Sequence, residues 1–466
     1  MTKPTTTLIS GGTVVLGQTV SRQDLLIQGE RIAALGDLSG CKADVKVDAE
    51  GLLVLPGAID PHVHFNDVFM NTISVHDYYT GTLAAAYGGV TSIIDFSNQG
   101  PGESLMDTLR HKREEEDGQA LVDWGVHPVI TQPTPETLAE IRLMVEAGAP
   151  SLKCYMTYRD EGLMVELEDL RRISERLRDA GGMLLMHAED NQILEEKIPA
   201  LIRSGFTAPI YHARSRPLES ENKAIRDCIQ VARETGVRLF IVHMASADGA
   251  ELVGAARAEG LDVIAETCTH YLLFTDQMME RKDGIKWICS PPLRDQPNQD
   301  RLWAALRDGR ISMVTSDDAA YLWEAKLYGA DRFDKVPNGI PGIEPRLNLL
   351  YSEGVAKGRL SLPRFVEVIS STPALLFGLA PQKGSLAPGA DADIVLFDPH
   401  TKWTMNQNTL HMATDYSAYE DIEITGKIKS VYSRGELIIE GERCLAEKGR
   451  GRYLHRQLDL SMRASI

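Results

Sequence analysis

Short stretches at both ends of the chain alternate apolar and polar residues, with glycines between them. At the amino-terminal end this pattern covers about the first 50 residues, and it returns over residues 384–399 and 428–442. Side chains of a strand point alternately to its two faces, so a repeat of two predicts short β-strands, and the glycines mark turns. We therefore expect residues 1–54 and 384–445 to form one composite β-sandwich domain.

Residues 55–383 follow a different pattern, in which short apolar runs alternate with longer segments. The apolar runs predict eight strands, over residues 52–60, 91–97, 126–130, 151–157, 182–188, 238–245, 261–267 and 311–317. The longer segments have apolar residues three and four apart and predict helices over 106–117, 135–148, 166–180, 219–236, 248–260 and 299–308. Strands that alternate with helices are typical of parallel α/β folds, and eight of them predict a (β/α)8 TIM barrel.

The last segment, residues 446–466, is basic and polar. It has no apolar repeat that would place it in a core. We expect it to be an arm on a neighbouring subunit, or a disordered tail.

Composition narrows the classes of partner. A chain of 466 residues with 43% hydrophobic residues can bury a barrel-sized core and one smaller domain. A formal net charge of −17 argues against nucleic acid, which needs a basic face. We find neither a signal-peptide pattern nor an apolar run of about 20 residues that would span a membrane. The six cysteines have no close pair, which favours reduced thiols and a cytoplasmic protein over a disulfide framework or a cysteine metal site.

Six residues of ligand type follow or end predicted barrel strands. They are His62, His64, Lys153, His187, His243 and Asp317. The carboxyl ends of barrel strands all face one mouth, where such enzymes place their active sites. Two histidines separated by one residue in an extended segment point the same way and can hold one ion. A single histidine of this kind can instead be a core residue bonded to a backbone carbonyl, but the shared position of all six favours a metal site.

Lys153 and Asp317 are charged residues in apolar strands. An unpaired buried carboxylate is costly, so Asp317 is expected beside a cation, as a metal ligand and general base. A buried Lys153 ammonium is also unfavourable. A lysine carboxylated by carbon dioxide would instead be an anion able to bridge two metals. The alternatives for Lys153 are a side chain that reaches solvent or one that pairs with an acid.

Several motifs together resemble one enzyme family over essentially the whole chain. They are PGAIDPHVHF, SLKCYMTY, MHAED, VHMAS, ETCTHYLLF, CSPPLRD, SDD and PNGIPGIEPR. This set resembles the hydantoinase and dihydropyrimidinase branch of the amidohydrolase superfamily, and its pattern is most similar to D-hydantoinases and phenylhydantoinases. The resemblance implies metal-dependent opening of a hydantoin or 5,6-dihydropyrimidine ring to an N-carbamoyl amino acid.

The resemblance also implies roles for individual residues. His62, His64, Lys153 and Asp317 would hold the more buried of two divalent metal ions, for which the resemblance implies zinc. N6-carboxylysine at position 153, His187 and His243 would hold the more exposed ion. A hydroxide between the metals would be the nucleophile. Tyr158 would stabilise the oxyanion, and Ser290 and Asn338 would bind the amide edge of the ring through backbone groups. Members of this family are commonly homotetramers, and the tail resembles their C-terminal arms.

Two departures keep alternatives open. Asp318 stands where hydantoinases commonly have histidine, so we expect a change either in the residues that contact the metal ligands or in the pocket. HVHFND and LKCY resemble allantoinases, which leaves an allantoinase-type ring hydrolase as the second interpretation. Dihydroorotases typically carry an arginine at the position of Asn66, which argues against that activity. A non-catalytic scaffold related to dihydropyrimidinase is disfavoured because all six ligand positions are present. Among the loop residues, Phe65, Phe69, Met70 and Ile73 are expected either to line a substituent pocket or to pack within the loop.

Overall fold

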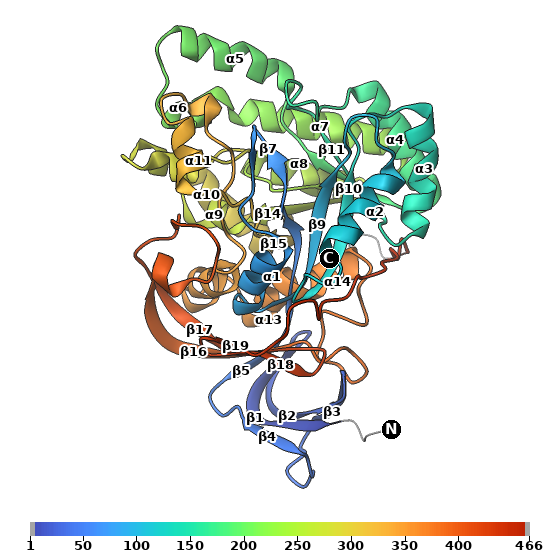
Figure 1. The fold of residues 1–466 in the computed structure, drawn as a ribbon, viewed down its shortest axis with the longest axis vertical. Helices are drawn as coiled ribbons and strands as arrows, with labels where there is room; N and C mark the ends of the chain where they lie inside the picture. The colour runs from blue at the N-terminus through green and yellow to red at the C-terminus, as the bar shows by residue number, and fades with distance from the viewer. Residues whose placement is uncertain (1–4, 462–466) are drawn as a thin grey trace.

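The computed structural model of the protein describes residues 5–461, and a barrel of eight parallel strands forms its larger part (Figure 1). Each of the eight predicted stretches overlaps one strand of the barrel. In chain order they are β6 (Ala58–Val63), β9 (Val90–Asn98), β10 (Asp123–Val129), β11 (Ser151–Tyr155), β12 (Met183–His187), β13 (Arg238–Ile241), β14 (Val263–Cys268) and β15 (Met313–Thr315). They pair in this same order. A parallel sheet in sequential order is the arrangement expected of a TIM barrel.

Helices cover the outside of the barrel, and the six predicted ones are confirmed as α2, α3, α4, α7, α8 and α10. The full set of α-helices is α1 (Tyr78–Tyr87), α2 (Leu105–Glu116), α3 (Pro135–Glu146), α4 (Leu167–Ala180), α5 (Asn191–Arg203), α6 (Ile210–Ser215), α7 (Leu218–Thr235), α8 (Ala247–Ala258), α9 (Thr269–Leu273), α10 (Gln296–Arg307), α11 (Trp323–Tyr328), α12 (Arg346–Leu350), α13 (Leu362–Val366) and α14 (Thr372–Leu376). Side-chain caps fix several starting points. Thr134 accepts a hydrogen bond from the N–H of Thr137 at the start of α3, and Asp295 accepts one from Asn298 at the start of α10.

The seam between the first and last barrel strands is closed by one arginine. Arg346 is completely buried and donates hydrogen bonds from Nη1 to the carbonyl of Val314 in β15 (2.7 Å) and from Nη2 to the carbonyl of Ile59 in β6 (3.1 Å). Its Nε lies 3.3 Å from the Asp60 carboxylate. These bonds join the two strands where they share no continuous ladder.

Strands from both ends of the chain form one mixed sheet, as predicted for the smaller domain. They are β1 (Thr6–Leu16), β2 (Thr19–Gln28), β3 (Arg31–Gly36), β4 (Val45–Asp48), β5 (Leu53–Pro56), β16 (Ile394–Met405), β17 (Ile422–Ser433), β18 (Glu436–Glu440) and β19 (Arg443–Cys444). The two halves meet where β5 pairs antiparallel with β16. In Figure 1 this domain lies below the barrel.

The predicted strand over residues 52–60 is in fact two strands in two domains. β5 belongs to the mixed sheet, and β6 belongs to the barrel. Gly57 separates them at a point of close packing, because a Cβ there would lie 2.1 Å from Oγ1 of Thr91. The Pro56–Gly57 pair at the break is a turn signal, which the prediction of one continuous strand did not take into account.

The described part of the C-terminal segment packs on the barrel of its own chain. The Arg456 side chain is completely buried and donates to the carbonyl of Val126 (2.6 Å) and to Oγ of Ser151 (3.1 Å). The backbone N–H of Leu454 donates to Trp124 (2.7 Å). This differs from the disordered tail among our expectations, because the basic residues have acceptors on the barrel. Residues 462–466 of the segment lie outside the described residues.

Within residues 5–461, no helix combines the length and hydropathy needed to cross a membrane.

Candidate active site

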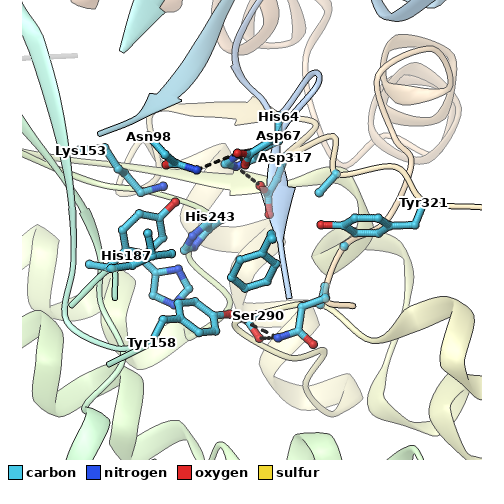
Figure 2. Close-up of a pocket in the computed structure, with 17 residues that line it drawn as sticks. His64, Asp67, Asn98, Lys153, Tyr158, His187, His243, Ser290, Asp317 and Tyr321 are labelled. Carbon is cyan, nitrogen blue, oxygen red and sulfur yellow. Dashed lines mark hydrogen bonds and ion pairs between the residues drawn. The ribbon is translucent and has the colours of Figure 1, made fainter. Parts of the chain in front are cut away.

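A pocket opens at the carboxyl ends of the barrel strands (Figure 2). It is lined by every predicted site residue except His62, namely His64, Lys153, Tyr158, His187, His243, Ser290, Asp317 and Asn338. His62 has no exposed surface and lies beside this pocket, with its ring 5.3 Å from that of His243. The structure therefore brings together residues that are up to 276 positions apart, from His62 to Asn338.

Two imidazoles and one carboxylate converge in the pocket. The Nε2 atoms of His62 and His64 are 3.3 Å apart, and Oδ1 of Asp317 lies 3.0 Å from the first and 3.4 Å from the second. Such close ring nitrogens have no room for two protons between them. The three side chains form a group whose ligand atoms lie within 4.8 Å of one another, a set that suits a divalent metal.

Acidic residues behind the two histidines hold their other ring nitrogens. Nδ1 of His62 contacts Oε1 of Glu266, and Nδ1 of His64 lies 3.1 Å from Oδ2 of Asp67. Asn98 in turn donates to Asp67 (2.7 Å). Second-layer carboxylates of this kind orient metal-binding imidazoles and raise their basicity. Sequence reasoning missed both acids, although Glu266 ends an apolar strand as Asp317 does.

At His64 and Asp317, burial and the neighbouring charged groups shift the pKa in opposite directions. Burial lowers the pKa of His64, but hydrogen bonds with Asp317 and Asp67 outweigh it and raise that pKa to about 9. Burial alone would raise the pKa of Asp317, whereas the neighbouring His62 and His64 hold it well below its usual range. The Asp317 carboxylate is thus ionised and surrounded by groups that favour its charge.

Lys153 is completely buried and has no hydrogen-bond partner for Nζ within residues 5–461. The nitrogen lies 4.4 Å from the centre of the Phe96 ring and 4.9 Å from that of Tyr155. Burial lowers the pKa of Lys153 to about 8. Both ordinary alternatives, a lysine that reaches solvent and a lysine paired with an acid, are wrong for this side chain. Lys153 is thus a buried amine without a hydrogen-bond partner in the described chain, and it lines the same pocket as His64, His187 and His243.

His187 and His243 form a second group beside Lys153. Their ring centres are 4.5 Å apart, and burial lowers the pKa of both, so both are neutral imidazoles of the kind that binds metals. Nε2 of His187 lies 2.8 Å from Oε2 of Glu189, which also accepts a 2.6 Å hydrogen bond from Arg216. Nδ1 of His243 is buried without a hydrogen-bond partner in the described chain.

Three site residues have a left-handed backbone although none is glycine. The φ angles are 64° at Tyr158, 38° at His243 and 49° at Asp317. Such conformations cost about 1 to 3 kcal/mol each and are concentrated at functional sites. Here they turn side chains into the pocket where a strand ends.

Tyr158, Ser290 and Asn338 make up a polar wall of the pocket. Nδ2 of Asn338 donates to Oγ of Ser290 (3.0 Å) and lies 3.4 Å from the hydroxyl of Tyr158. In Figure 2, Tyr158 and Ser290 lie together, apart from His64, Asp67 and Asp317. The pKa of Tyr158 is raised by burial, so its hydroxyl remains a proton donor. This wall can bind an amide group that faces the histidine cluster.

Asp318 is not among the residues that line the pocket, so it does not change the pocket wall directly. Its Oδ2 lies 2.7 Å from Nδ1 of His76, and its Oδ1 accepts hydrogen bonds from the N–H groups of Gly342 (2.7 Å) and Ile343 (3.1 Å). These partners hold the Asp318 carboxylate outside the pocket that Asp317 lines. The Asp318 carboxylate anchors two loops instead.

The four loop residues whose role the sequence left open divide into two pairs. Phe69 lines the pocket, and Met70 lines an adjoining hollow that shares Tyr158 and Asn338 with it. Phe65 is completely buried against α1, and Ile73 is half exposed. Asn66 is exposed and is not among the residues that line the pocket.

A second metal-type group, formed by Cys268, His270 and Asp317, adjoins the first and shares Asp317 with it. All six cysteines of the chain are free thiols.

Comparison with known proteins agrees with this geometry. Residues 53–438 match the model of the amidohydrolase family. The chain is 38% identical over 458 residues to a D-hydantoinase of Geobacillus stearothermophilus, covering 97% of this chain and 96% of that protein. It is 40% identical over 457 residues to a D-phenylhydantoinase of Escherichia coli O1:K1 / APEC, covering 97% of this chain and 98% of that protein. The crystal structure of a dihydropyrimidinase from Brevibacillus agri NCHU1002 superposes with a TM-score of 0.95 at 38% identity, covering 97% of this chain and 99% of that one.

The match extends over most of the chain, in sequence and in fold, and the pocket residues come from the same motifs that carry the resemblance. This protein therefore belongs to the amidohydrolase family, in the branch that contains the D-hydantoinases and dihydropyrimidinases.

Proposed function

We propose that this protein is a metal-dependent cyclic amidase that opens a hydantoin or 5,6-dihydropyrimidine ring to an N-carbamoyl amino acid. One observation carries this proposal: a cluster of His62, His64 and Asp317, with the orphaned Lys153 beside it, faces a polar wall that can hold an amide. The named activities of the relatives support it.

The donor set fits two divalent metal ions, and we assign zinc. His62, His64, Asp317 and Lys153 would hold one ion, and Lys153, His187 and His243 would hold the other. Lys153 as N6-carboxylysine would serve both, which accounts for a buried amine without a partner. When bound, the metals would polarise the ring carbonyl and lower the pKa of the attacking water.

The chain's own residues would then bind the ring and move the proton. Ser290 and Asn338 hold the amide edge, and the Tyr158 hydroxyl donates to the carbonyl oxygen as negative charge develops on it. Asp317 accepts the proton of the attacking water and delivers it to the ring nitrogen as the C–N bond breaks. Water is thus added across one ring amide bond, which leaves a carboxylate and a carbamoyl N–H.

We further propose a homotetramer in the cytoplasm. The resemblance to tetrameric family members supports the assembly, and six free thiols suit a reducing compartment. An allantoinase-type activity at the same site is the alternative, since two motifs resemble that group.

The test is turnover by zinc-loaded protein, expressed with bicarbonate, on hydantoin, 5-phenylhydantoin, dihydrouracil and allantoin, followed by product NMR. Opening of the first three rings supports the proposal, whereas activity on allantoin alone would transfer the assignment to the alternative. Asp317→Asn and Lys153→Ala should abolish most turnover. Near-normal turnover by either variant with metal present would contradict the assigned roles.

A further inference from the structure

A second buried lysine lies next to the pocket, in α11. The Lys326 side chain has no exposed surface. Its Nζ donates hydrogen bonds to three backbone carbonyls, those of Pro337 (2.7 Å), Gly339 (2.7 Å) and Ile288 (3.2 Å). An ammonium has three N–H donors, so the three carbonyls use all of them.

This arrangement is unlike that of Lys112 and Lys383, which are also buried. Lys112 pairs with the Asp95 carboxylate (2.6 Å), and Lys383 pairs with three aspartates, the nearest at 2.7 Å. Within the described chain, no carboxylate lies within ion-pair distance of Lys326. A buried ammonium is costly without a counter-charge, so a chain that keeps one requires a local reason.

The three carbonyls belong to the two loops that carry the polar wall. Pro337 and Gly339 lie on either side of Asn338, and Ile288 lies two residues before Ser290. The loops also bond to each other, from the N–H of Gly339 to the carbonyl of Ile288 (2.9 Å). The Lys326 ammonium therefore connects both loops through its hydrogen bonds.

The charge also acts on the peptide groups it touches. A cation at the carbonyl of Pro337 draws electrons from the Pro337–Asn338 peptide bond and makes the N–H of Asn338 a stronger donor. In the same way, the cation at the carbonyl of Ile288 makes the N–H of Cys289 a stronger donor. Burial lowers the pKa of Lys326 to about 7, while three carbonyl acceptors favour the protonated form, since a neutral amine has only two N–H donors.

We propose that Lys326 is a positioning residue for substrate: its ammonium sets the spacing of the Ser290 and Asn338 loops and strengthens the backbone donor that holds the amide edge of the ring. The inference rests on the proposed function for the ring's binding site, but the claim about the loops does not require a particular ring.

The experiment compares Lys326→Met, which removes charge and donors, with Lys326→Gln, which removes the charge and keeps an N–H donor group. Lys282→Met is the matched control, because Lys282 is exposed and lines neither the pocket nor the hollow beside it. Lys326→Met should raise KM for the ring by roughly tenfold or more with a smaller change in kcat, since a displacement of about 1 Å can cost on the order of 10²-fold. Lys326→Gln should have a KM between those of Lys326→Met and wild type, and Lys282→Met should match wild type.

Metal content of each variant, by mass spectrometry, should stay at the wild-type value, because no candidate ligand lies on these loops. Hydrogen exchange should increase over residues 286–291 and 336–341 in Lys326→Met. A folded Lys326→Met with wild-type KM, or with unchanged exchange of these loops, would overturn the inference. Wild-type protein that opens no ring while Lys326→Met loosens the loops would instead reject the proposed function and leave the positioning role intact.

Discussion

Replacement of Glu266 by glutamine tests the metal site through a residue that contacts a proposed metal ligand but does not line the pocket. Oε1 of Glu266 contacts Nδ1 of His62 and accepts a hydrogen bond from the backbone N–H of His243 (3.0 Å). One carboxylate thus orients two of the proposed ligands. Glutamine keeps the size and one acceptor but removes the negative charge that raises the basicity of His62.

The size of the effect follows from the lost interaction. A hydrogen bond to a charged group contributes about 1.5 to 3 kcal/mol, and about 1.4 kcal/mol is a tenfold change in affinity. We therefore expect Glu266→Gln to bind zinc roughly ten to a hundred times more weakly, which matches the range for second-layer partners of metal ligands. Fold and thermal stability with saturating metal should change little.

The assay is competition for zinc with a fluorescent chelator at equilibrium. The control is Glu175→Gln, an exposed glutamate on α4, whose affinity should equal that of wild type. Wild-type zinc affinity in a folded Glu266→Gln would refute the reasoning, because it would mean that His62 does not bind metal or that Glu266 does not set its basicity.

Three further predictions concern the frame around the site. Asp318→Asn loses the carboxylate acceptor that contacts His76 and the N–H groups of Gly342 and Ile343. This change should lower the free energy of unfolding by about 1.5 to 3 kcal/mol in urea titrations, with metal content unchanged; loss of metal at full stability would contradict the role assigned to Asp318. Arg346→Met opens the seam between β6 and β15 and leaves Asp60 unpaired, so unfolding should require about 3 to 5 kcal/mol less, and a shift below about 1 kcal/mol would argue against the seam. Burial lowers the pKa of His212 to about 3 in the folded chain, whereas that of an unfolded histidine is about 6.5. Above pH 6.5 the imidazole is neutral in both states, so it adds no pH dependence to stability. Below pH 6.5 the unfolded chain binds a proton that the folded chain does not bind. Stability should therefore fall by up to about 1.4 kcal/mol per pH unit from pH 6.5 toward 3, and His212→Gln should flatten this part of the profile; equal slopes for both proteins would count against a neutral buried imidazole.

The barrel and its candidate ligands were predictable because both depend on local pattern. An apolar run followed by an amphipathic segment reports a buried strand and its covering helix, and this sufficed for all eight strands. His187, His243 and Asp317 each follow directly from such a run, so the topology alone places them at one mouth.

Pairings between distant residues were not predictable in this way. His62 and Glu266 are 204 positions apart, and neither position shows which of the many acids reaches the histidine. The place of the Asp318 side chain was not predictable either, because its partners, His76 and the N–H groups of Gly342 and Ile343, lie far from it in sequence. Arg456 and Lys326 look like ordinary surface residues in sequence, and only the backbone carbonyls that receive their hydrogen bonds explain their burial.

The most direct test of the account is ring opening by the same preparation with and without metal. Protein stripped by a chelator is incubated with hydantoin, and zinc is added back in steps while product NMR follows the N-carbamoyl amino acid. We predict no product from the stripped protein and a rate that rises until two zinc ions per chain are bound. Full turnover by the stripped protein, or none with two ions bound on any of the four rings, would contradict the central claim.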